Sequence, residues 1–235
     1  MQLSAFWPTW IIEIRSIQLT VLVIIFVSLT AVIALHLTSG FDNFVYLYFR
    51  SVQRSANIDA VMITATSVGD VSTLLIIAIV LTIIRRTRKM GMIFLTTIVI
   101  IAILVTYIKP IIGRSGPPYK FEPALRLPKH FIIEDDSLLP SARDLSYPSK
   151  LVAITTAFAF IVGFGLNRRS RIAGSIIWSF PVIIAITKLY IMQHYLTDTI
   201  SGSVLGLIVS TILSNMMELD KPFLMSRFKG KGDIP

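Results

Sequence analysis

Long apolar runs divide this chain and constrain its fold more than any other feature. The clearest runs are Ile17 to Leu37, Gly91 to Ile108, Leu151 to Leu166, Ile172 to Leu189 and Thr199 to Met217. Each is close to the roughly 20 residues that a helix needs to cross a bilayer. Mean hydropathy is +0.76 and only 15% of residues are charged, unlike a soluble domain. The sequence therefore predicts an all-α integral membrane protein.

A sixth apolar run, residues 60–84, contains Gly69 and Asp70 near its middle. An aspartate inside a span is costly because its charge loses water. We therefore predict that a short helix ends at Gly69 and that Asp70 caps a second helix, Val71 to Ile84. The fold expected is a six-span transmembrane helical bundle over residues 17–217.

Two further segments suit the membrane surface. Residues 1–16 mix tryptophans and charges with apolar positions, which predicts an N-terminal interfacial segment. Residues 41–58 carry five aromatic side chains beside Arg50 and Arg54, which predicts a short helix lying on the surface.

Basic residues cluster between the apolar runs. The formal net charge is +9, and the cations gather in residues 85–89, in residues 167–171 and in a basic tail, residues 218–235. This placement follows the positive-inside rule, so we predict cytoplasmic connectors and termini in the cell membrane and no nucleic-acid partner. The loop 109–150 and the end of the fifth span then face outward. Because the chain has no cysteine, disulfides and thiolate metal sites are excluded.

One outward-facing stretch, Thr187 to Asp198, combines a cation, a histidine and an aspartate. If residues 190–198 are helical, His194 and Asp198 share a face, and the carboxylate accepts a hydrogen bond from one imidazole nitrogen. That is the geometry of an oriented nucleophile or base. Taken alone, the stretch favours a histidine at the membrane surface with Asp198 as a helix cap.

Two more outward-facing pieces offer groups that suit a phosphate. Lys109 and Arg114 follow the third span among glycines, and lysine and arginine neutralise phosphoryl oxygens. Ser149 and Lys150 begin the fourth span, where a helix N-terminus favours an anion. Each piece alone also fits a snorkelling cation or a plain N-cap.

Together, the order and spacing of these pieces resemble the type 2 phosphatidic acid phosphatase superfamily, whose members are six-span lipid phosphatases related to vanadium haloperoxidases. The family's motifs are a lysine, six residues and Arg-Pro; then Pro-Ser-Gly-His; then Ser-Arg, five residues, a histidine, three residues and an aspartate. The resemblance covers roughly residues 60–215. It implies that His194 is the nucleophile, that Asp198 orients it, and that Lys109, Ser149 and Lys188 hold phosphate oxygens.

The chain departs from these motifs at three places. Gly116 stands where the family has the arginine of Arg-Pro, Lys150 and Leu151 stand for Gly-His, and Thr187-Lys188 stands for Ser-Arg. In the family the second-motif histidine is the general acid, a role that contributes about 10²–10⁴ in rate. Leucine cannot supply a proton, whereas Arg114 and Lys150 partly restore the positive charge.

Two classes of function follow. The first is a phosphohydrolase for a lipid phosphate or diphosphate, either a polyprenyl lipid or a phospholipid. A diphosphate needs less help, because its leaving group is itself a phosphate, and His130 or Glu134 is an alternative proton donor. The second is an impaired or inactive family member that binds or transports lipid phosphates. A vanadate peroxidase is a distant third reading. We expect no metal or other cofactor, because no cluster has ligand spacing.

Overall fold

The computed structural model describes residues 12–118, 121–124, 142 and 144–221, and in these ranges the chain is almost entirely helical. The helices are α1 (Ile17–Ala34), α2 (Ser39–Ser51), α3 (Ala56–Val68), α4 (Val71–Ile83), α5 (Arg88–Ile112), α6 (Lys150–Asn167), α7 (Arg171–Ile176), α8 (Ser179–Tyr190) and α9 (Leu196–Met216). Most of the predicted segments 1–16 and 218–235 lie outside the described residues.

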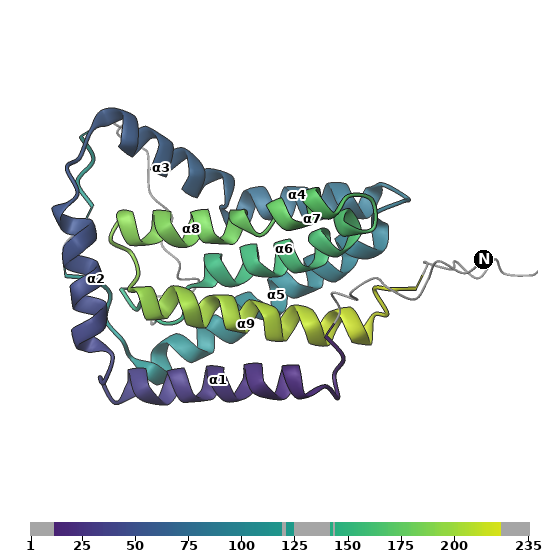
Figure 1. The fold of residues 1–235 in the computed structure, drawn as a ribbon, viewed down its shortest axis with the longest axis horizontal. Coiled ribbons are helices and arrows are strands. Elements are labelled where there is room, and N and C mark those ends of the chain that lie inside the picture. The colour runs from purple at the N-terminus through teal and green to yellow at the C-terminus, as the bar shows by residue number, and fades with distance from the viewer. Residues whose placement is uncertain (1–11, 119–120, 125–141, 143, 222–235) are drawn as a thin grey trace, which may run out of the picture.

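The long helices run side by side, and α2 lies across one end of them (Figure 1). Five helical segments are long and apolar enough to cross a membrane, and the bent pair α3–α4 makes a sixth if it crosses as one span. Many large apolar side chains on α1 and α4 are exposed, including Ile17, Val27 and Ile76. Exposed apolar side chains of this kind are stable in contact with the acyl chains of a bilayer. The all-α membrane bundle predicted from the sequence is therefore confirmed.

The break predicted in the second apolar run occurs where expected. Helix α3 ends at Val68 with Gly69 as its C-cap, and α4 begins at Val71, with a bend of 45° between the two helices. Asp70 occupies the N-cap position of α4, but its side chain does not cap the helix. Instead, the Ser72 hydroxyl donates to the Asp70 carboxylate at 2.5 Å. The N-cap position of Asp70 was predicted correctly, whereas the predicted capping hydrogen bond from its side chain is not formed.

The core lies where α6 packs against α9, with α5 beside them (Figure 1). Glycines on α9 allow the two helices to approach closely. A Cβ added at Gly206 would lie 2.3 Å from the Ala153 carbonyl oxygen, and one at Gly202 would lie 2.5 Å from the Ser149 carbonyl oxygen. Small residues at a helix crossing permit this backbone contact in membrane proteins. The contact fixes the start of α6 against the first turns of α9.

Replacing Gly206 by alanine is expected to destabilise the bundle, because the added methyl group must push the α6 backbone away. Overpacking of this kind costs about 1–3 kcal/mol of unfolding free energy. Gly40→Ala is the matched control, since nothing lies within 4 Å of a Cβ at that position of α2, and alanine there stabilises the helix by about 0.5–1 kcal/mol. Unfolding in detergent by heat or denaturant measures both. Equal effects of the two substitutions would contradict the close crossing.

Candidate functional site

Buried polar side chains gather at the end of the bundle where α5 ends, α6 begins and the α8–α9 connection lies (Figure 1). The sequence-predicted residues with side chains that are almost fully buried are Lys109, Ser149, Lys150, Lys188, His194 and Asp198. Buried charged groups are rare in proteins unless they are paired or serve a function. The three motif segments therefore converge on one region, and the contacts below link them directly.

Residues 190–198 do not form one helix, so His194 and Asp198 do not share a helix face. Helix α8 ends at Tyr190, Met192 has a left-handed backbone with φ of 58°, and α9 begins only at Leu196. His194 therefore lies in the connection between two helices. Asp198 belongs to the first turn of α9, where its Oδ2 accepts a hydrogen bond from the Tyr195 backbone N–H at 2.9 Å. This carboxylate cap starts α9 after His194 and prevents one continuous helix.

A backbone carbonyl, not Asp198, holds the imidazole of His194. Its Nδ1 lies 2.7 Å from the Ser146 carbonyl oxygen and 3.9 Å from Asp198 Oδ2. A carbonyl can only accept a hydrogen bond, so Nδ1 carries the proton and Nε2 of the neutral ring has a lone pair. Asp198 is too distant for a hydrogen bond but close enough to favour a positive charge on the ring. The expected hydrogen bond between His194 and Asp198 is therefore absent, and Ser146 orients the ring.

Arg114 joins Asp198 to the surface helix α2. Its guanidinium donates to Asp198 Oδ1 at 2.6 Å, to Asp42 Oδ2 at 2.5 Å and to the Thr197 hydroxyl at 2.8 Å. It also lies 4.4 Å from the centre of the Tyr195 ring. Arg114 reaches this place because Gly113, with φ of 66°, ends α5 and turns the chain. The guanidinium thus pairs with two buried carboxylates, while the phosphate contact expected for Arg114 stays a prediction.

The lysines and Ser149 lie beside this network. Lys188 Nζ donates to the Gln193 side-chain oxygen at 2.6 Å, which ties α8 to the residue before His194. The Ser149 backbone N–H donates to the Asp198 carbonyl oxygen at 3.2 Å. Ser149 is the N-cap residue of α6, as predicted, but its hydroxyl does not cap the helix. Among the described residues that buried hydroxyl has no hydrogen-bond partner, so it is available to a ligand.

The structure shows what surrounds two of the residues that depart from the family motifs, Gly116 and Leu151. A Cβ at Gly116 would lie 3.8 Å from the Gln193 carbonyl oxygen and 3.9 Å from the Ser146 Cβ, so this position adjoins both segments that hold His194. Leu151 is buried in an apolar cluster with Val152 and Ile184. Neither Leu151 nor these apolar neighbours can donate a proton.

Sequence reasoning missed Asp42, which anchors α2 over the site. Asp42 accepts hydrogen bonds from the Thr197 backbone N–H at 3.1 Å and the Thr197 hydroxyl at 2.6 Å, besides that from Arg114. It also missed Asp59 on α3, which accepts from the Tyr190 hydroxyl at 2.6 Å. Both aspartates have apolar or aromatic neighbours in the sequence, Phe41 and Phe44 beside Asp42 and Ile58 beside Asp59. The rule applied to Asp70, that such a carboxylate needs a partner, is the signal that identifies them.

The buried Tyr147 and the half-buried Tyr195 border the site without adding charge to it. Burial raises the pKa of the Tyr195 phenol, which Arg114 partly opposes, and burial also raises the pKa of the Tyr147 phenol. The Tyr147 and Thr30 hydroxyls share a hydrogen bond of 2.6 Å, which links the loop before α6 to α1. Both phenols therefore stay neutral at physiological pH.

Within the described ranges, no group of three histidine, cysteine, aspartate or glutamate side chains could hold a metal ion. His130 and Glu134, the alternative proton donors named from the sequence, lie outside those ranges.

Comparison with known proteins agrees with the fold of the chain. The family model of the PAP2 superfamily matches residues 90–221. A transmembrane PAP2-type phosphatidylglycerolphosphate phosphatase from Bacillus subtilis has a similar fold, with a TM-score of 0.70 and 19% identity over 89% of this chain and 100% of that one. LpxE of Aquifex aeolicus has a TM-score of 0.53 and 18% identity over 73% of this chain and 92% of its own. Comparison with curated protein sequences finds no match.

Proposed function

The chain belongs to the PAP2 superfamily, and from this membership and the geometry around His194 we propose that it is a phosphohydrolase for membrane lipid phosphates or diphosphates. One observation carries the proposal. The Ser146 carbonyl lies 2.7 Å from His194 Nδ1 and so directs the lone pair to Nε2. An imidazole held in a single tautomer is ready to act as a nucleophile.

The reaction then proceeds in two steps. Nε2 attacks the phosphorus atom, the bond from phosphorus to the leaving oxygen breaks, and the phosphoryl group is carried on His194. The ring becomes positively charged while Nδ1–H remains bonded to Ser146, and Asp198 Oδ2 at 3.9 Å stabilises that charge. Water then attacks phosphorus and releases inorganic phosphate, which returns the ring to its starting tautomer. Asp198 is thus a positioning and electrostatic residue.

Positive charge and a free hydroxyl supply the phosphate contacts. Lys109 in the last turn of α5, Lys150 at the start of α6 and Lys188 in the last turn of α8 are all buried at this end of the bundle. A phosphate ester carries about −1.5 to −2 charges at neutral pH, and ammonium groups are its common partners. The Ser149 hydroxyl, which has no partner among the described side chains and backbone groups, adds a neutral donor.

The membrane orientation is part of the proposal. The basic segments 85–89 and 168–169 and Lys221 lie together at the end of the bundle opposite His194. The positive-inside rule then makes that end cytoplasmic and the His194 site outward-facing in the cell membrane.

Purified protein is expected to release phosphate from a polyprenyl diphosphate faster than from the matching polyprenyl monophosphate or from phosphatidic acid. The reason is that Leu151 cannot protonate a leaving alkoxide, whereas a leaving phosphate needs little protonation. The lost acid is worth about 10²–10⁴ in rate, so we expect a preference of at least about a hundredfold in kcat/KM. Equal rates on the three lipids would contradict the leaving-group argument, and no release from any of them would exclude the hydrolase.

A second function, binding or transport of lipid phosphates without turnover, is favoured by a specific observation. The motif arginine is replaced by Gly116, and the nearby Arg114 is occupied by Asp42 and Asp198. Within the described residues 109–118, 146–151 and 187–198, no other arginine is left to clamp the transition state. In that case the protein binds a lipid phosphate with an affinity that falls in Lys109→Ala, and His194→Ala leaves binding intact. No measurable binding would exclude this function.

A further inference from the structure

A second site lies at the opposite end of the bundle, and it does not depend on the His194 chemistry. A cavity of about 840 Å³ opens between the α4–α5 turn, the α6–α7 turn and the segment after α9. Asp220 is the one acidic residue of the lining. Six basic residues line the cavity: Arg85, Arg86, Lys89, Arg168, Arg169 and Lys221. Its size is that of a cavity for an organic ligand, much larger than a free phosphate ion requires.

The lining has two chemically distinct parts. The basic side chains form the rim, and five of the six are exposed, Lys89 being partly buried. The inner wall is apolar and includes Met90, Val162, Phe164 and Leu219. A charged rim above an apolar wall at the end of membrane helices matches the junction between the headgroup and the acyl chain of a phospholipid. A soluble anion would use only the rim.

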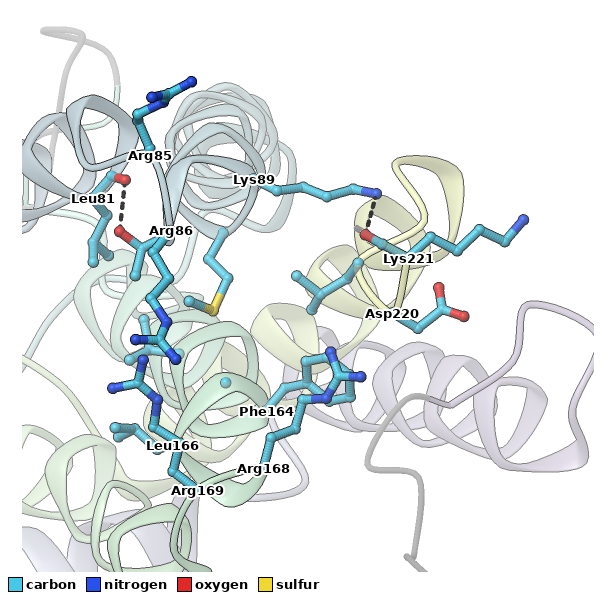
Figure 2. A pocket seen from close by; sticks show the side chains of 15 residues that line it. Leu81, Arg85, Arg86, Lys89, Phe164, Leu166, Arg168, Arg169, Asp220 and Lys221 are labelled. Atoms are coloured by element: carbon cyan, nitrogen blue, oxygen red, sulfur yellow. Dashed lines mark hydrogen bonds between the residues drawn. The ribbon is translucent and has the colours of Figure 1, made fainter. Parts of the chain in front are cut away.

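Local contacts hold parts of the rim in place. Lys89 Nζ donates to the Lys221 carbonyl oxygen at 2.9 Å, which attaches the segment after α9 to the start of α5 (Figure 2). The Arg168 guanidinium lies 5.5 Å from the centre of the Phe164 ring. A Cβ at Gly165 would lie 2.5 Å from the Met90 sulfur, so α5 and α6 touch at the wall of the cavity. The cavity is therefore bounded by packed helices and is more than a cluster of surface cations.

Two guanidinium groups of the rim, those of Arg86 and Arg169, have no hydrogen bond to a protein acceptor within the described residues. In Figure 2, those of Arg86 and Arg169 point toward one another, and no hydrogen bond joins either to the residues drawn. Like charges repel across such an opening, and a phosphate between them provides the matching bidentate acceptor. The positive-inside rule explains the presence of cations at this end, but not their arrangement around a cavity with an apolar wall.

We propose that this cavity binds one anionic phospholipid of the surrounding leaflet, with its phosphate held by Arg86 and Arg169 and its acyl chain starting along Met90 and Leu219. The ligand class is set by the two parts of the lining: a phosphate for the arginines and an apolar chain for the wall. The bound lipid would join the α4–α5 turn to the α6–α7 turn and so stabilise the end of the bundle opposite the His194 site.

The test uses the full chain in detergent and native mass spectrometry with dioleoyl phosphatidylglycerol, dioleoyl phosphatidylcholine and inorganic phosphate as separate probes. We expect phosphatidylglycerol to bind saturably with one molecule per chain, and the neutral lipid to bind far more weakly. Each cation near an anionic lipid contributes about fivefold in affinity, so Arg86→Gln and Arg169→Gln each weaken binding about fivefold and the double variant roughly thirtyfold. The same lipid raises the unfolding temperature of the parent, and this rise is lost in the double variant.

The control removes two charges from the same end but outside the cavity. Arg15 and Arg171 are exposed and do not line it, so Arg15→Gln with Arg171→Gln is expected to change phosphatidylglycerol binding less than twofold. Equal weakening by both pairs would overturn the proposal in favour of general surface attraction. Inhibition of lipid binding by millimolar inorganic phosphate, with equal affinity for both anions, would show a free-phosphate site and overturn the lipid assignment. Absence of saturable binding would overturn it altogether.

Discussion

Replacing His194 by alanine is expected to lower phosphate release at least about a thousandfold, because no other residue then carries the phosphoryl group. The measurement is inorganic phosphate released from polyprenyl diphosphate by purified protein. A hydrogen bond such as the one to the Ser146 carbonyl is worth about 1 kcal/mol, so thermal unfolding of the variant is measured beside its activity. A variant that stays folded at the assay temperature shows that the loss of rate arises from chemistry and not from unfolding.

The control for this substitution is His36→Asn, at the same end of the bundle. His36 is exposed and has a left-handed backbone with φ of 58°, a conformation that asparagine tolerates better than alanine. We expect its activity to equal that of the parent. Asp198→Asn should lower the rate less than His194→Ala, because Asp198 acts on the ring only through charge at 3.9 Å. A parent rate that survives His194→Ala would rule out the histidine nucleophile.

Replacing Arg114 by methionine is expected to reduce the unfolding free energy by about 3–5 kcal/mol, the usual effect of removing one partner from a buried ion pair. Two carboxylates depend on this guanidinium: Asp42 at 2.5 Å and Asp198 at 2.6 Å, both almost inaccessible to solvent. Without it each must stay charged and unpaired or take up a proton. Thermal unfolding in detergent measures the effect, with the exposed Arg15→Met as control.

A double-mutant cycle shows whether Arg114 serves the carboxylates or the phosphate. If the network is as described, Asp42→Asn and Arg114→Met couple by at least about 1 kcal/mol. Arg114→Lys should restore little stability, because an ammonium lacks the fork that reaches two acceptors. The opposite pattern, unchanged stability with a raised KM for the lipid in Arg114→Lys, would assign Arg114 to the phosphate and contradict the network as its main role.

The sequence alone predicted the membrane class, the break at Gly69 and the segments that meet at the site. These features depend on local quantities, namely hydropathy, turn chemistry and the spacing of a few motif residues. Between Tyr190 and Asp198 the same local rules left two alternatives, one continuous helix or a helix cap at Asp198. In the structure the carboxylate of Asp198 caps a new helix at Tyr195. A capping interaction and a continuous helix compete for the same residues, and composition does not decide between them.

What tertiary structure decided is the partner of each buried charge. Ser146 stands 48 residues before His194, and Asp42 stands 72 residues before Arg114, so no local pattern connects them. The packing of α6 on α9 through Gly202 brings the Ser149 segment against Asp198, and α2 then places Asp42 beside Arg114. The sequence by itself determined a membrane fold of the PAP2 superfamily with a histidine at one end of the bundle. Only the tertiary structure determined which carbonyl orients that histidine and which cation supports its aspartate, because long-range packing brings those groups within hydrogen-bond distance.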